Sequence, residues 1–229
     1  MRVAVLCLMG IALYACVKVP ISGRRQMNLL PEKELMSMSL TNYNQFLKEN
    51  TTLSDAQAAQ IKRVGKNISE AVTKYMNENG FSKRIDGYQW EFNLVKDSLV
   101  NAWCMPGGKV VFYTGILPIT LNDTGVAVVM GHEIAHAIAR HGNERMSQAL
   151  ALQMGGMTLQ AATSQESERT KNIFMQSYGI ASTLGMLKYS RKHESEADKL
   201  GLVFMALAGY NPEAAVGFWE RMSAPNVLP

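Results

Sequence analysis

"HEIAHAIARH", residues 132–141, places two histidines four positions apart, with a glutamate directly after the first. The run is otherwise mostly apolar and predicts a buried helix. Each helical residue turns by about 100°, so His132 and His136 lie on one face, with Glu133 beside them. This H-E-x-x-H pattern is typical of catalytic zinc, which needs two neutral imidazole ligands and a carboxylate base that is not a ligand. Buried histidines that are only hydrogen-bonded are the alternative.

A catalytic zinc site of this kind needs a third protein ligand and keeps one coordination position open. The chain has four histidines. His141 follows His136 by five residues, and on a continuing helix it would point about 140° away from it. The sequence therefore predicts that His141 does not join the site. His193 is a weaker candidate, which we expect at the rim.

"SRKHESEADKLG", residues 190–201, contains the remaining acidic candidates on one predicted helix. Helical geometry places Glu194, Asp198 and Gly201 on one face, whereas Glu196 points about 200° from Glu194. We predict that Glu194 is the third metal ligand and that Asp198 accepts the N–H of a ligating histidine. Gly201 would allow the two helices to approach closely. A charged, solvated helix face is the alternative for this segment taken alone.

The composition of the 229-residue chain is that of one folded domain. Apolar residues make up 47% and charged residues 18%, so the chain can bury a core and is not disordered. The net charge is only +4, and the basic residues are scattered along the sequence. We therefore expect no nucleic-acid partner.

The pattern of apolar residues predicts an α+β fold that is mostly helical. Strand-like runs at 88–96, 98–104 and 109–117 predict a small antiparallel sheet. Helices are predicted at 31–50, 54–79, 122–141, 144–163, 166–188, 190–208 and 212–222. No linker divides the chain after residue 30, so residues 31–229 form a single predicted domain.

The N-terminus predicts export and lipidation. Residues 1–15 have one arginine followed by a short apolar run, which is typical of a secretory signal peptide. Leu13 to Cys16 are similar to a bacterial lipobox, so we expect a lipid on Cys16. Residues 16–30 would then be a lipidated tether to the membrane or a loose wrapping segment. Val17 after the cysteine favours the inner leaflet of the outer membrane, in the bacterial periplasm. The alternative is an ordinary signal peptide with a chance cysteine.

Three stretches of this chain resemble one known family. They are "GHEIAHAIARH", "ESEAD" and "NAWCMPGGKVVFYTGIL" (101–117). Together they resemble the zinc metallopeptidases that include the HtpX heat-shock protease, the CAAX prenyl protease and the OMA-type peptidases, which form metallopeptidase family forty-eight. The resemblance implies a zincin-like (gluzincin) fold and one zinc ion bound by His132, His136 and Glu194. It also implies that Glu133 is the catalytic base.

The third stretch looks like the family's edge-strand hairpin, along which an extended polypeptide pairs through main-chain hydrogen bonds. In this sequence Asn101, Ala102, Val110 and Val111 would then lie near the substrate. The alternative is that this hairpin is only part of the core sheet. Many relatives continue past this C-terminus with a Ser-x-His-Pro element, so the chain is either a truncated fragment or a short form.

The expected function is a zinc-dependent endopeptidase of the bacterial cell envelope that hydrolyses misfolded or unassembled proteins. Its rival is a chaperone-like periplasmic lipoprotein that binds such proteins and has a mainly structural zinc site. Glu133 disfavours the rival, because a structural metal site has little use for a glutamate that is not a ligand. Zinc-dependent hydrolysis of a non-peptide amide is a third possibility, disfavoured only by the resemblance.

Overall fold

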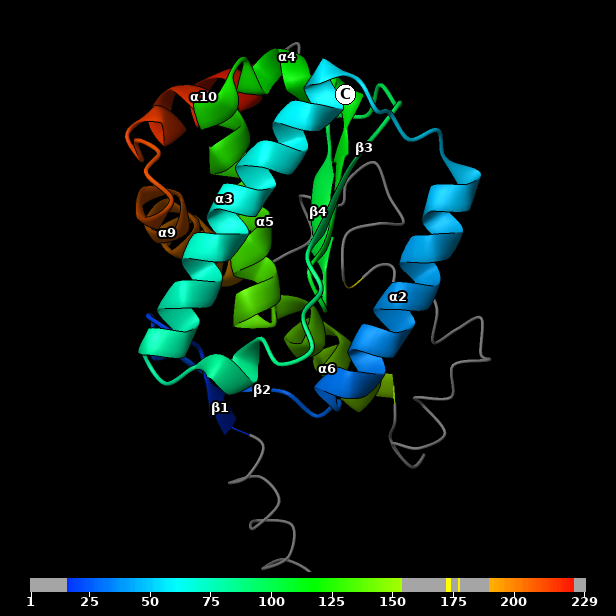
Figure 1. The fold of residues 1–229 in the computed structure, drawn as a ribbon. Coiled ribbons are helices and arrows are strands. Elements are labelled where there is room, and N and C mark those ends of the chain that lie inside the picture. The colour runs from blue at the N-terminus through cyan, green and yellow to red at the C-terminus, as the bar shows by residue number, and fades with distance from the viewer. Residues whose placement is uncertain (1–15, 154–171, 174–176, 178–189, 225–229) are drawn as a thin grey trace, which may run out of the picture.

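The computed structural model describes residues 16–153, 172–173, 177 and 190–224 (Figure 1). The helices are α2 (Glu32–Glu49), α3 (Ala56–Glu78), α4 (Leu117–Thr120), α5 (Asp123–Ala139), α6 (His141–Gln153), α9 (Arg191–Leu207) and α10 (Ala214–Met222). The strands are β1 (Cys16–Lys18), β2 (Arg25–Met27), β3 (Glu91–Val95), β4 (Ala102–Met105) and β5 (Lys109–Tyr113). The predicted class, α+β and mostly helical, is confirmed.

The three-stranded sheet is mixed, which corrects the predicted antiparallel sheet. Its strand order is β3-β5-β4, with β5 in the centre. A tight turn through Gly107 and Gly108, both with positive φ, joins β4 to β5 as an antiparallel hairpin. β3 instead pairs with the other side of β5 and runs parallel to it. Alternation of apolar residues predicts strands but not their order, so the sequence did not reveal this arrangement.

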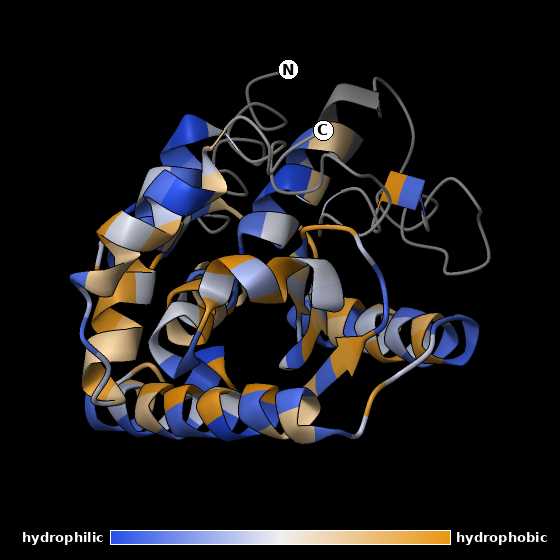
Figure 2. Cartoon of the chain, turned by 90° about the horizontal axis from the view of Figure 1, so that it is seen from above, coloured by the Kyte–Doolittle hydropathy of each residue, from blue (hydrophilic) through white to orange (hydrophobic). Residues whose placement is uncertain are grey.

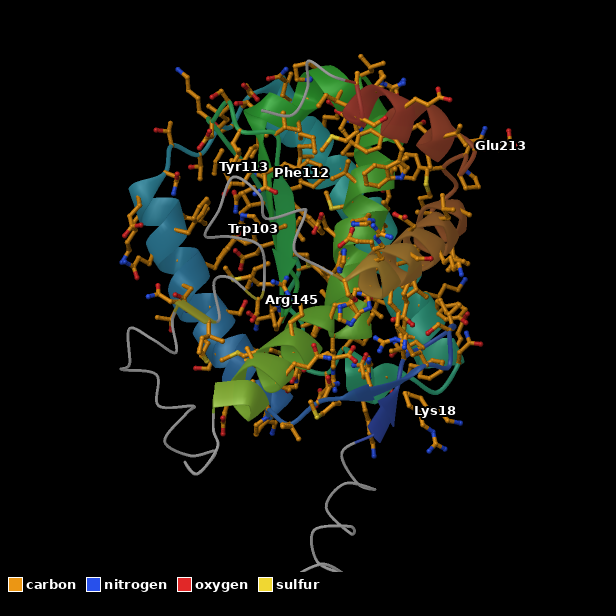
Figure 3. All side chains as sticks on the ribbon, turned by 180° about the vertical axis from the view of Figure 1, so that it is seen from behind. Lys18, Trp103, Phe112, Tyr113, Arg145 and Glu213 are labelled. Carbon is orange, nitrogen blue, oxygen red and sulfur yellow. The ribbon has the colours of Figure 1, made fainter. Side chains whose placement is uncertain are left out.

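Helices cover both faces of the sheet. Successive residues of β5 point to opposite sides: Val110 and Phe112 join the core formed with α3, α5 and α9, whereas Val111 and Tyr113 pack in a second cluster with α2. Trp103 of β4 lies in that second cluster, in the layer between α2 and the sheet (Figure 3). The outer helices carry hydrophilic and hydrophobic residues in alternation along each turn (Figure 2), as expected of helices with one buried face.

Helix α5 lies at the centre of the molecule and is crossed closely by α9 (Figure 1). Asn122 caps its N-terminus by accepting a hydrogen bond from Gly125 N, and every residue from Gly125 to Ala139 is buried. The crossing point is formed by two glycines. A β-carbon at Gly201 would lie 2.8 Å from His132 N, and one at Gly131 would lie 2.7 Å from Gly201 O. The expected close approach at Gly201 is therefore observed.

Residues 16–30 pack against the domain as a wrapping segment, one of the two arrangements expected for them. β1 and β2 form an antiparallel hairpin near the junction of α5 and α6 (Figure 1). Beyond its turn, Arg24 forms ion pairs of 2.7 Å with both Glu144 and Glu196. The three side chains are only 13%, 8% and 7% exposed. These ion pairs connect the hairpin to α6 and α9, a contact that the sequence around Arg24 does not indicate.

Some predicted segments lie outside the described residues. They are the signal peptide at 1–15, most of the predicted helix at 166–188 and the end of the one at 144–163. Among the helices that are described, none is both long and apolar enough to cross a membrane.

We predict that Gly201→Ala destabilises the protein by about 1–3 kcal/mol, because its methyl group must push α9 away from α5. Gly217→Ala is the matched control, since a β-carbon there meets only the end of the Arg221 side chain at 3.4 Å. Replacing a helical glycine by alanine should stabilise α10 by up to about 1 kcal/mol. Urea unfolding of both variants tests this. Equal effects of the two substitutions would contradict the close crossing.

We also predict that acid weakens the anchoring of the hairpin. Burial alone would raise the pKa of Glu144 and of Glu196, but hydrogen bonds from Arg24 and a neighbouring histidine outweigh it and lower both pKa values to about 2. A carboxylate with a depressed folded-state pKa contributes stability above its unfolded pKa, about 4.5, and loses it as the pH falls toward 2.

The measurement is the free energy of unfolding of the metal-free protein between pH 6 and pH 3. The double variant Glu144→Gln with Glu196→Gln should be less stable than the parent at pH 6, and the difference should shrink below about pH 4.5. A difference that stays constant over this range would show that the two carboxylates are not held ionised by the folded structure.

Candidate functional site

Three predicted ligands converge from two helices. The Nε2 atoms of His132 and His136 are 3.0 Å apart. Glu194 reaches them from α9, with one oxygen 3.4 Å from His132 Nε2 and the other 3.7 Å from His136 Nε2. Tetrahedral zinc with ligand distances of about 2.0–2.1 Å separates neighbouring ligand atoms by about 3.3 Å. The three side chains therefore have the spacing of a zinc ligand set.

The polar atoms of this cluster also fit a cation. Burial lowers the pKa of His132, but hydrogen bonds to Asp198 and Glu194 outweigh it and raise the pKa to about 10, so this position favours a positive charge. Burial holds the pKa of His136 well below its usual range, so its ring is neutral. Glu194 Oε1 is buried with no hydrogen-bond partner among the described residues. A metal ion would replace the proton on His132 and give this oxygen a partner.

Asp198 lies behind His132, as its position on the helix predicts. Its Oδ1 is 2.9 Å from His132 Nδ1. A carboxylate there accepts the Nδ1 hydrogen, which leaves the lone pair of Nε2 free to face the other two ligands. The edge of Trp219 from α10 packs against the same ring, with 5.5 Å between ring centroids.

Glu133 follows the first ligand and is buried beside the cluster. Burial raises its pKa to about 8, which suits a group that takes up and releases a proton near neutral pH. Burial raises the pKa of the nearby Cys104 thiol well above its usual value, and the negative charge of the Glu133 carboxylate raises it further. Cys104 is therefore protonated at neutral pH and is not a thiolate nucleophile.

His141 contacts the site, although sequence reasoning placed it on the far side of the helix. That prediction assumed one continuous helix, but α5 ends at Ala139 and Arg140 takes a left-handed conformation with φ 58°. The chain turns there, and His141 Nδ1 comes to lie 2.9 Å from His136 Nδ1. His141 does not belong to the ligand set, but it touches a member of it. The contact depends on the backbone reversal at Arg140. No glycine marks this reversal in the sequence, so the contact could not be predicted.

A buried polar cluster that the sequence did not predict lies behind His141. Glu196 Oε2 is 2.8 Å from His141 Nε2, and Glu144 Oε2 is 2.9 Å from His193 Nε2. The rings of His141 and His193 stack with centroids 4.5 Å apart. His193 is therefore buried, whereas the sequence analysis expected it at the rim of the metal site. Glu196 does point away from Glu194, as its helical position predicts, and this direction leads into the polar cluster.

The four residues predicted to line the substrate lie on two different parts of the sheet, two in the central strand and two at or just before an edge strand. Val110 and Val111 lie in β5, whose main chain is paired on both sides, so their predicted place on an edge strand is wrong. Ala102 begins β4, the edge of the described sheet, and Asn101 precedes it; both are buried. β4 contacts α5, so this edge runs beside the helix that carries His132.

Comparison with known proteins finds relatives among metallopeptidases. The chain is 32% identical over 206 residues to mitochondrial metalloendopeptidase OMA1 of Schizosaccharomyces pombe, covering 90% of this chain and 57% of that protein. It is 27% identical to OMA1 of Homo sapiens over 89% of this chain and 39% of that protein. It is also 27% identical to metalloprotease YcaL of Escherichia coli, over 76% and 71% respectively. The chain thus spans about half the length of the OMA1 relatives.

These relatives contradict the predicted location in the bacterial periplasm, at the inner leaflet of the outer membrane. Relatives of fungal, plant and animal origin that match this chain are named as mitochondrial proteins. A short apolar segment with one arginine does not identify the compartment by itself, because the same pattern has different meanings in different cells. The prediction depended on assuming a bacterial cell.

The sequence profile of Peptidase family M48 matches residues 57–228, which contain all three converging side chains and Glu133. Peptidases of this family depend on zinc, and its gluzincin arrangement agrees with two histidines on one helix and a glutamate on a later one. The family match and the OMA1 relatives both support a metalloprotease with a zinc cofactor. This chain belongs to Peptidase family M48.

Proposed function

We propose that this protein is a zinc-dependent endopeptidase that cleaves misfolded or unassembled polypeptides. The observation that carries the proposal is the convergence of His132, His136 and Glu194 around one point, with the buried carboxyl of Glu133 next to them. These three side chains would hold the zinc ion, and Asp198 would orient His132. When bound, zinc supplies the Lewis acidity that activates a water molecule and a peptide carbonyl.

Glu133 performs the proton transfers in this proposal. Its carboxylate takes a proton from the attacking water, and the same group then gives a proton to the leaving amine. A polypeptide would pair with β4, because this strand, unlike β5, is at the edge of the described sheet. Such pairing involves the main chain, which suits unfolded substrates of many sequences. Asn101 and Ala102 would then lie next to the substrate.

Lipidation of Cys16, the first residue of β1, stays a prediction. A lipid there would tether the domain through the packed hairpin. Incubation of the parent and a Cys16→Ser variant with a membrane fraction of the source cells would measure whether this residue carries the attachment.

The proposal predicts different losses for two variants. Glu133→Gln should keep zinc but reduce casein cleavage by at least 100-fold, because the base is lost while the ligands remain. Glu194→Ala should lose both zinc and cleavage, since two imidazoles alone bind zinc weakly. Zinc content and cleavage of unfolded casein are measured side by side on the same preparations. A parent that binds zinc and casein without cleaving it would favour the rival binding protein over the endopeptidase.

A further prediction concerns Asp198. Asp198→Asn should weaken zinc affinity by about 10- to 100-fold, because His132 loses the carboxylate that fixes its Nδ1 hydrogen. Asp86→Asn is the control for the change of one charge, since Asp86 is exposed. Competition with a chelator measures both affinities. If the two variants bind zinc equally well, Asp198 does not orient His132.

A further inference from the structure

The imidazole of His136 is the start of a buried chain of polar contacts that leads away from the metal position. His136 Nδ1 lies 2.9 Å from His141 Nδ1, and His141 Nε2 lies 2.8 Å from Glu196 Oε2. Arg24 donates from Nε to the same carboxylate oxygen over 2.7 Å, and the Ser22 hydroxyl donates to the other oxygen. The rings of His136 and His141 are 3% and 0% exposed. The chain connects the N-terminal hairpin to a proposed zinc ligand.

The hydrogens in this chain can be assigned from donor and acceptor chemistry. A carboxylate only accepts, so the hydrogen between Glu196 and His141 belongs to His141 Nε2. A neutral imidazole carries one hydrogen, so His141 Nδ1 is an acceptor and the neighbouring Nδ1 of His136 is the donor. The lone pair of His136 is then on Nε2, the atom that faces His132 and Glu194. Any other arrangement puts a hydrogen on the atom that must bind the metal.

We propose that Glu196 and His141 are positioning residues that fix the ring orientation and tautomer of His136 for zinc binding, with Arg24 and Ser22 of the N-terminal hairpin holding Glu196. This inference rests on the proposed ligand set. The two histidine ligands are then oriented in different ways. His132 contacts a carboxylate directly, whereas His136 reaches its carboxylate through a second imidazole. Carboxylates that act behind metal-binding histidines typically contribute 10- to 100-fold in metal affinity.

Glu144 provides a matched control within the same cluster. It pairs with the same arginine over the same 2.7 Å and is as buried as Glu196, with side chains 8% and 7% exposed. It also accepts from a histidine, but that histidine is His193, which is not in the chain to His136. Removing either carboxylate breaks one ion pair of Arg24. Only the removal of Glu196 takes the acceptor away from His141 Nε2.

The experiment measures zinc dissociation constants by chelator competition for the full chain and for Glu196→Met, Glu144→Met and Glu196→Gln. Glu196→Met should weaken zinc binding by about 10- to 100-fold, because His141 can then move its hydrogen to Nδ1 and force the wrong tautomer on His136. Glu144→Met should change zinc affinity by less than about 3-fold, although urea unfolding shows a similar loss of stability. Glu196→Gln should recover most of the affinity, since its amide oxygen can still accept from His141.

Equal losses of zinc affinity in the two methionine variants, or no loss in Glu196→Met, would overturn the proposal and leave the cluster a purely structural one. If Glu196→Met does not fold, His141→Phe replaces it, because phenylalanine keeps the ring that stacks on His193 but offers no acceptor to His136; unchanged zinc affinity in that variant also overturns the proposal. Glu194→Ala is measured in parallel. Full zinc affinity in Glu194→Ala would show that the ligand set itself is wrong, a failure distinct from that of the positioning residues.

Discussion

The site depends on the backbone contact between α5 and α9. Gly131 and Gly201 meet where the helices cross, and neither position has room for a β-carbon. This contact brings Glu194, about two turns before Gly201 on α9, within 3.4 Å of His132 Nε2. A larger residue at the crossing would move α9 outward, and ligand distances of a metal site tolerate shifts of only about 0.2 Å. The packing of two small residues therefore sets the geometry of three ionisable ones.

A second constraint follows from the burial of the polar side chains of α5. Every residue of α5 after its first turn is out of solvent, including two histidines and a glutamate. Buried polar groups are tolerated only when they have partners. His132 has Asp198, and His136 has His141. The partner of His136 is itself buried and needs Glu196, which in turn needs the hairpin. The polar network therefore extends to the surface on the side of the N-terminus, where Arg24 completes it.

The parts of the fold and site that sequence reasoning predicted are those governed by local periodicity. His132, His136 and Glu133 follow from the spacing on one helix, and Glu194 with Asp198 from the spacing on another, and the structure brings these five together. The strand order and the polar cluster depend on contacts between distant segments. Arg24 and Glu196 are 172 residues apart, and nothing in either local sequence indicates the other. Val110 and Val111 were misplaced for the same reason.

The end of α5 shows how a strained residue contributes to the site. A left-handed conformation at a residue other than glycine costs on the order of 1–3 kcal/mol and persists only where its surroundings enforce it. Here Arg84 donates to the carbonyls of Ile138 and Ala139, which closes the C-terminus of the helix, and Glu32 of α2 pairs with Arg140 over 3.1 Å. The reversal at Arg140 then turns His141 back toward His136. Had α5 continued, the same histidine would point away from the metal position, and His136 would lose the acceptor for its Nδ1 hydrogen.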